Sequence, residues 1–299
     1  MRLKADGANT FSFTNDGVVR GRGSADASTS AAGDGVRIGN PGNAGIAEAT
    51  ISNSGDILAT GRQRNGTVYF DGTAQDFTLL NSGAIDARGG AGSGVSIEVG
   101  AFNGATQNGR ILNSGQIIAS GGLAEDSGIR LFSNEASTTF EGDISNFESG
   151  FIGRDGHGYA VLVEDNVVFD GALINDGTID GSVLLNDGDL FLLDNSTLSL
   201  DIASLTKFDT VETTGTIIAD GILDISFSGS LPTIGQEFDL FDFGFISGEF
   251  DLIQSGGIGL DTSDLFTNGT VRVASIPEPA TGGLLGLALV AMATRRRRS

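Results

Sequence analysis

The sequence predicts an all-β protein: a parallel β-helix (β-solenoid) with a β-rich C-terminal closing region and a short C-terminal hydrophobic helix. Three observations predict it. Of 299 residues, 47 are Gly and only 4 are Pro, which indicates many tight turns between short strands. A short motif recurs along the first two thirds of the chain. Beyond the last copy, the apolar alternation becomes longer and richer in Phe and Leu.

The recurring motif has the form apolar-x-Asn-Ser/Asp-Gly-x-Ile. Clear copies are ISNSGDI, LLNSGAI, ILNSGQI and LINDGTI; ISNFESGFI is a copy with two extra residues, and FTNDGVV near residue 15 is an eroded one. The anchoring asparagines recur at intervals of roughly 30 residues: Asn53, Asn81, Asn113, Asn146 and Asn175. Between them lies a Gly followed by an alternating strand, as in GVRIG, GTVYF and GVSIEV. Each unit therefore contains at least two short strands.

Such short strands gain stability by stacking about 4.8 Å apart, so that each backbone pairs with the units above and below. One internal aliphatic stack is expected to contain Ile57, Ile85, Ile117, Ile152 and Ile179. A second is expected to contain Val36, Val68, Val95 and Ile129. At the bends, Asn tolerates left-handed backbone angles and its amide can form a ladder, and the Gly supplies a positive φ. We interpret the motif as a turn sequence that shapes the backbone, and not as a binding site.

The pattern divides the chain into three segments: a β-helix repeat domain (1–195), a β-rich closing region (196–274) and a C-terminal signal (275–299). An open solenoid end is a template for aggregation, so we expect the closing region to cover the last turn. Its clearest alternations are Leu198, Leu200 and Ile202, followed by Phe241, Phe243 and Phe245. We interpret these Phe residues as core and not as a ligand platform.

The net charge of −21 makes nucleic acid and anionic lipid improbable partners, because both are polyanions. The absence of Cys excludes disulfides, thiolate nucleophiles and thiolate metal sites, and a single His makes a transition-metal site improbable. No cofactor-binding motif appears in a supporting context. We therefore expect no cofactor and no enzymatic activity.

One bend, GRDGHGYAV, gathers chemically capable side chains: Arg154, Asp155, His157 and Tyr159. Parallel β-helices can host polysaccharide lyases and hydrolases, whose chemistry needs an acid/base pair. These four residues are the weaker, catalytic alternative, since one polar bend among several Gly-rich bends is expected by chance.

A weaker alternative for a calcium site rests on aspartates in two neighbouring turns: Asp176, Asp180, Asp187 and Asp189. Carboxylates on stacked turns can share Ca²⁺. The spacing fits neither an EF-hand loop nor a calcium-binding nonapeptide repeat, so we interpret the aspartates as turn residues.

The C-terminus combines Pro277, Glu278 and Pro279 with an apolar run over 280–294 and the cluster Arg295, Arg296, Arg297 and Arg298. Fifteen helical residues span about 22 Å, short of the roughly 30 Å hydrocarbon core, which suits a temporary membrane anchor. The arginines hold the end of the chain in the cytoplasm and place the rest on the outer side. The prolines stop a helix or strand from running into this anchor and leave an extended dipeptide that a protease can reach.

In order, spacing and position these residues resemble the PEP-CTERM sorting signal. The resemblance implies a Gram-negative bacterium that makes exopolysaccharide, and export through an inner-membrane-anchored intermediate. It also implies recognition and cleavage at Pro277–Pro279 by an exosortase, a transpeptidase-like membrane protease. The repeats resemble the passenger β-helices of autotransporters, and the segments TLSLDI, GQEFDLFDF and ISGEFD resemble the region that closes such proteins.

These features together predict an exported structural or adhesive protein of the cell surface or biofilm matrix, with exopolysaccharide as a further partner. The alternative is a β-helix polysaccharide lyase or hydrolase that uses the Arg154–Tyr159 bend. The first residues, MRLKADGANTFSFTNDG, are basic but lack an apolar signal-peptide core. Since export requires such a signal, we expect one to be missing from this sequence through truncation or a mis-assigned start.

Overall fold

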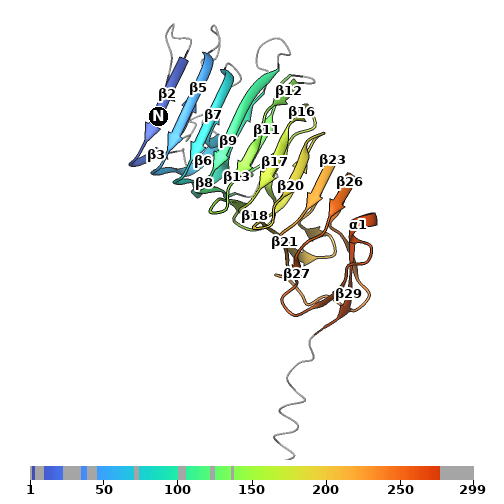
Figure 1. The fold of residues 1–299 in the computed structure, drawn as a ribbon. Coiled ribbons are helices and arrows are strands. Elements are labelled where there is room, and N and C mark those ends of the chain that lie inside the picture. The colour runs from blue at the N-terminus through green and yellow to red at the C-terminus, as the bar shows by residue number, and fades with distance from the viewer. Residues whose placement is uncertain are drawn as a thin grey trace, which may run out of the picture.

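The described chain consists almost entirely of β-strands stacked in parallel. The computed structural model describes residues 2–3, 10–22, 35–38, 46–70, 74–99, 106–121, 125–135 and 138–276. Its strands form three long parallel sheets around one core, with the N-terminal strands at one end of the stack and the C-terminal strands at the other (Figure 1). The all-β prediction is confirmed, and the sheets have the arrangement of a β-solenoid. We call each full turn of the chain a rung.

Each rung contributes one segment to each sheet. Sheet 1 contains β2 (Thr10–Asn15), β5 (Ile46–Asn53), β7 (Ala74–Asn81), β9 (Gln107–Asn113), β12 (Thr138–Glu141), β13 (Ile144–Asn146), β16 (Val167–Asp170), β17 (Ala172–Asn175) and β20 (Asp189–Leu192). Sheet 2 contains β3 (Val18–Arg22), β10 (Gln116–Ala119), β14 (Phe151–Arg154), β18 (Thr178–Asp180), β21 (Thr197–Ser204), β24 (Ile222–Ser226) and β27 (Leu252–Gln254). Sheet 3 contains β1 (Arg2–Leu3), β4 (Val36–Ile38), β11 (Ile129–Phe132), β15 (Tyr159–Val163) and β19 (Ser182–Leu185).

Four long strands pass from one sheet to the next without a break in strand geometry: β6 (Asp56–Phe70), β8 (Ala84–Glu98), β23 (Val211–Ala219) and β26 (Phe241–Gly248). β6 and β8 join sheet 2 to sheet 3, and β23 and β26 join sheet 3 to sheet 1. The rungs therefore close one continuous three-sided core.

The predicted aliphatic stacks are confirmed by the strand register. Ile57, Ile85, Ile117, Ile152 and Ile179 are consecutive partners in sheet 2 and are fully buried. Val36, Val68, Val95 and Ile129 are consecutive partners in sheet 3 and are also fully buried. Apolar side chains that recur at the same position of each rung thus bury one another along the axis of the solenoid.

The asparagines form a continuous ladder at the corner between sheets 1 and 2. The side-chain Nδ2 of each donates to Oδ1 of the asparagine in the next rung, at 2.7 or 2.8 Å, from Asn15 through to Asn175. The eroded copy at Asn15 is therefore a true member of the repeat. Each Nδ2 also donates to backbone carbonyls at its own corner, which ties the rungs together in a buried setting.

The reason predicted for the Gly of the motif is wrong. Neither the ladder asparagines nor Gly55, Gly83 and Gly115 have a positive φ. A Cβ on Gly83 or Gly115 would lie 2.0 Å from the carbonyl oxygen of the equivalent Gly in the preceding rung. Glycine is required because two backbones approach closely at this corner, and not because of a left-handed conformation.

The parallel pairing continues past residue 195, where the sequence pattern places the end of the repeat domain. Ile179 pairs with Leu198, Leu198 with Leu223, and Leu223 with Ile253, so sheet 2 extends through β27. A separate antiparallel sheet contains β25 (Glu237–Asp239), β28 (Gly259–Asp261) and β29 (Thr270–Ser275), with the one-turn helix α1 (Leu265–Asn268) beside it. Backbone bonds from Leu240 and Phe241 to Gly269 attach this sheet to the end of the solenoid (Figure 1).

The predicted Phe core of β26 is only partly correct. Phe241 is buried and Phe243 is half-buried, but Phe245 is 60% exposed. The register between β23 and β26 shifts after Phe243, where the strand passes from sheet 3 to sheet 1, so the alternation is interrupted.

The predicted C-terminal helix, with its flanking Pro-Glu-Pro and arginines, lies outside the described residues. Within the described ranges, no helix has the length and hydropathy needed to span a membrane.

Candidate functional site

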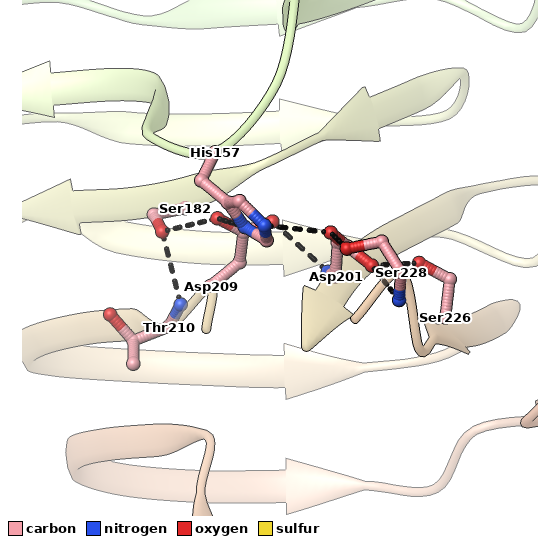
Figure 2. Close-up of polar contacts among 7 residues, drawn as sticks. All are labelled: His157, Ser182, Asp201, Asp209, Thr210, Ser226 and Ser228. Carbon is pink, nitrogen blue, oxygen red and sulfur yellow. Dashed lines mark hydrogen bonds and ion pairs between the residues drawn. The ribbon is translucent and has the colours of Figure 1, made fainter. Parts of the chain in front are cut away.

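The imidazole of His157 joins two carboxylates that belong to a later rung. His157 lies in the bend between β14 and β15, with Nε2 3.0 Å from Oδ2 of Asp201 and Nδ1 3.9 Å from Oδ1 of Asp209. Figure 2 shows the imidazole between the two aspartates. We call His157, Ser182, Asp201 and Asp209 the His157 cluster. It spans three successive rungs on one corner of the solenoid.

A short hairpin holds the two aspartates together. Asp201 is on β21, and Asp209 directly follows β22 (Lys207–Phe208), which pairs antiparallel with β21. The backbone N–H of Asp209 donates to the carbonyl of Asp201 at 2.9 Å. In return, the N–H of Asp201 donates to Oδ2 of Asp209 at 3.0 Å. These two bonds fix the carboxyl of Asp209 at the base of the hairpin.

Both carboxylates also accept hydrogen bonds from serine residues. Ser182, at the start of β19, donates its hydroxyl to Oδ1 of Asp209 at 3.1 Å and accepts the N–H of Thr210 at 3.1 Å. Asp201 accepts the hydroxyl of Ser226 at 2.7 Å and the N–H of Ser228 at 3.1 Å (Figure 2). Asp201 therefore has a polar partner in an earlier rung, His157, and further partners in the next rung, Ser226 and Ser228.

Burial dominates the electrostatics of Asp209, whose side chain is only 4% exposed. Burial raises its pKa above the usual range, because desolvation disfavours the charged carboxylate. Hydrogen bonds from Asp201, Ser182 and Gly158, together with the charge of His157, oppose this shift only in part. Asp180 lies in the same charged neighbourhood. Burial also raises its pKa, and the carboxylates of Asp209, Asp201 and Asp224 add to the rise, while a hydrogen bond to Ser199 opposes it.

The arrangement can hold and transfer a proton but presents no activated nucleophile. An imidazole beside a carboxyl of raised pKa is an acid/base pair. Ser226 donates its hydroxyl to Oδ1 of Asp201, and Ser228 donates to Oδ2, the oxygen that Nε2 of His157 also approaches, so the carboxylate links both serines to the histidine (Figure 2). A serine nucleophile would need the opposite order, with histidine in contact with the hydroxyl.

Two of the residues predicted beside His157 have other partners. The guanidinium of Arg154 donates to the backbone carbonyls of Asp126, at 2.6 Å, and Gly121, at 2.7 Å, and so ties its bend to the preceding rung. The backbone N–H of Asp155 donates to Ala119 of that rung at 3.1 Å. Tyr159 is half-buried, and burial raises its pKa, with smaller contributions from Glu212 and Asp165.

The four aspartates of the predicted alternative calcium site do not share a common partner. Asp176 accepts from Asn195, Asp187 from the hydroxyl of Thr214, and Asp189 from the N–H of Thr216. Asp180 lies near the His157 cluster. Over the ranges that the structure describes, no group of three or more His, Asp or Glu residues is placed to hold a metal ion.

Asp201, Asp209 and Ser182 were not predicted as site residues. Sequence reasoning grouped His157 with its neighbours along the chain, whereas in a solenoid the partners of a corner residue lie in later rungs. The signal that could have found them is the segment DIASLTKFD, which interrupts the rung with a hairpin bounded by the two aspartates.

Residues 275–298 match the PEP-CTERM protein-sorting motif. The motif marks this chain as an exported substrate of an exosortase. The export route it implies passes through a membrane-anchored intermediate to the cell surface. No curated protein sequence matches the chain. The sorting residues Pro277, Glu278 and Pro279 and the cluster Arg295–Arg298 fall inside the matched segment, and all of them lie outside the described residues.

Proposed function

We propose that the chain is a structural and adhesive component of the extracellular matrix or outer cell surface. The observation that carries this proposal is the asparagine ladder, which links six rungs through five consecutive side-chain hydrogen bonds. A ladder of this kind supports an elongated body whose outer faces repeat at about 4.8 Å. Repeated faces suit multivalent attachment, in which many weak contacts give a strong total. The sorting motif delivers such a body to the cell exterior.

The net charge of −21 supports the same proposal. It keeps the elongated protein soluble. Because like charges repel, it also opposes association of one protein molecule with another before assembly. It also directs the choice of partner toward polymers that are not themselves strongly anionic.

A second candidate, a polysaccharide lyase or hydrolase, is favoured by one observation: the imidazole of His157 lies beside a buried carboxyl of raised pKa. We place this candidate second because Arg154, which belongs to the same catalytic alternative, donates to backbone carbonyls of its own fold.

The test compares complementation in a deletion strain of the source bacterium. The full chain should restore surface attachment and matrix retention, and the His157→Gln variant should restore both equally. A triple alanine variant at Pro277, Glu278 and Pro279 should restore neither. If the His157→Gln variant fails and the purified protein degrades a polysaccharide, the chain is an enzyme and the structural proposal is wrong.

A further inference from the structure

A shallow groove runs along the outer side of the corner between sheets 1 and 2, across five rungs. Its volume is about 250 Å³, and the ten residues that line it include no charged side chain. Leu80 and Leu112 give it apolar surface, and Ser54, Ser82 and Ser114 also line it. An uncharged groove is a notable surface on a protein with a net charge of −21.

The hydroxyls are arranged as a row of acceptors. Each of the three serine hydroxyls donates to the carbonyl of the asparagine in the preceding rung, at 3.3, 3.4 and 3.5 Å. Their lone pairs are left to accept hydrogen bonds from a bound molecule. Because the rungs stack at about 4.8 Å, the acceptors recur at that interval along the groove. A polymer with a regular repeat of hydroxyl donors matches such a row better than a compact ligand does.

An exposed aromatic ring closes one end of the groove. Phe147 occupies the place that serine takes in the earlier rungs: its N–H donates to the carbonyl of Asn113, as the N–H of Ser114 does to Asn81, each at 2.8 Å. The two extra residues of this degenerate copy follow it directly. The side chain of Phe147 is 48% exposed, and that of Leu80, which also lines the groove, is 39% exposed. The ring therefore offers an apolar face to a ligand in the groove.

We propose that this groove binds a stretch of neutral polysaccharide. Sugar rings combine hydroxyl donors at their edges with apolar C–H faces, which match the serine row and the Phe147 ring. An anionic polymer would meet the field of a strongly acidic protein and would find no cation in the groove to compensate. The inference rests on the proposed adhesive function and specifies its ligand class and its site.

The test is affinity electrophoresis of the full chain in gels that contain dextran, galactomannan, hydroxyethylcellulose or alginate. At least one of the three neutral polymers should retard the protein, and alginate should not. The Phe147→Ser variant, which restores the residue type of the earlier rungs, should weaken retardation roughly tenfold, as expected when an aromatic anchor is removed. The Leu231→Ser variant is the matched control, since Leu231 is 72% exposed and does not line the groove; it should migrate like the wild type. Thermal unfolding should be unchanged in both variants.

The outcomes separate this inference from the proposed function. Retardation by a neutral polymer that depends on Phe147 supports the site. If no neutral polymer retards the wild type, or if Phe147→Ser has no effect, the groove is not the site; the adhesive function still stands if the full chain restores attachment in the deletion strain. If attachment is not restored either, the adhesive function fails with it. Retardation by alginate alone would overturn the ligand class.

Discussion

Asn113 and Asn146 are joined by a side-chain hydrogen bond of 2.8 Å across two rungs, in a fully buried corner. The same Nδ2 also donates to the carbonyls of Gly115 and Phe151, while Oδ1 accepts from Asn81. One amide thus satisfies polar groups from three successive rungs. Loss of one member of the ladder leaves partners unsatisfied on both sides.

We expect Asn113→Ala to destabilise the protein strongly. Each buried polar group left without a partner costs about 1–3 kcal/mol, and this change leaves several, so we expect a total of about 3 kcal/mol or more. Chemical denaturation followed by circular dichroism measures this loss. Asn195→Ala is the control, because Asn195 is exposed, and such changes usually alter the free energy of unfolding by no more than about 0.5 kcal/mol. Equal effects in the two variants would show that the ladder does not stabilise the fold.

Gly115→Ala tests the close approach of the rungs. The new Cβ would lie 2.0 Å from the backbone carbonyl of Gly83, so two rungs must separate, at a cost of about 2 kcal/mol or more. Gly17→Ala is the matched control from the first rung of the same motif, where a Cβ meets no atom within 4 Å. We expect a change of no more than about 0.5 kcal/mol there. Destabilisation by both variants to the same extent would point to backbone conformation instead of the contact between rungs.

Stability should fall as the pH rises above the ordinary range of aspartate. Burial raises the pKa of Asp209 in the folded state, so the folded protein binds more protons than the unfolded chain at pH values between the two pKa values. The contribution of Asp209 is therefore greatest at low pH and is lost as the pH rises through the folded-state pKa. Asp180 and Asp239, whose pKa values burial also raises, act in the same direction.

Thermal unfolding at pH 5 and pH 7.5 measures this dependence. The wild type should be more stable at pH 5, and Asp209→Asn should reduce the difference between the two conditions. The exposed Asp194→Asn variant should keep the wild-type difference. A steeper pH dependence in Asp209→Asn than in the wild type would contradict the assignment.

The sequence predicted the parts of the fold that depend on the repeat itself. Ile57 and Ile85, or Asn81 and Asn113, are one rung apart, and in-register stacking makes partners of residues at equivalent positions. The asparagine motif ends near residue 195, whereas the strand pairing continues from Ile179 to Leu198 because it needs only an apolar residue at that position.

Periodicity alone does not predict the contacts made by irregular insertions. The hairpin of β21 and β22 brings Asp201 and Asp209 to His157, and this contact has no periodic signature. The same holds for Phe147, where two extra residues place an aromatic ring on a row of serines. The corner Gly residues do recur with the motif, but the sequence does not show that the backbone of the preceding rung approaches them so closely.

The sorting motif makes a further prediction. Replacement of Pro277, Glu278 and Pro279 by alanine should leave the solenoid folded but block recognition by the exosortase, so the uncleaved chain should accumulate in the membrane fraction. Immunoblots of membrane and medium fractions measure this distribution. Replacement of Asp220, Asp251 and Glu249 by alanine is the control for a general effect of changed charge. Equal release of both variants into the medium would show that Pro-Glu-Pro is not the processing signal.

The most direct test of the account is mass spectrometry of both termini of the protein purified from cell and medium fractions of the source organism. We predict a mature chain outside the cytoplasm that ends near Pro279 and lacks Arg295–Arg298. An intact chain that still carries Arg298 and is found only in the cytoplasm would contradict export by the sorting motif, and the surface function would fall with it.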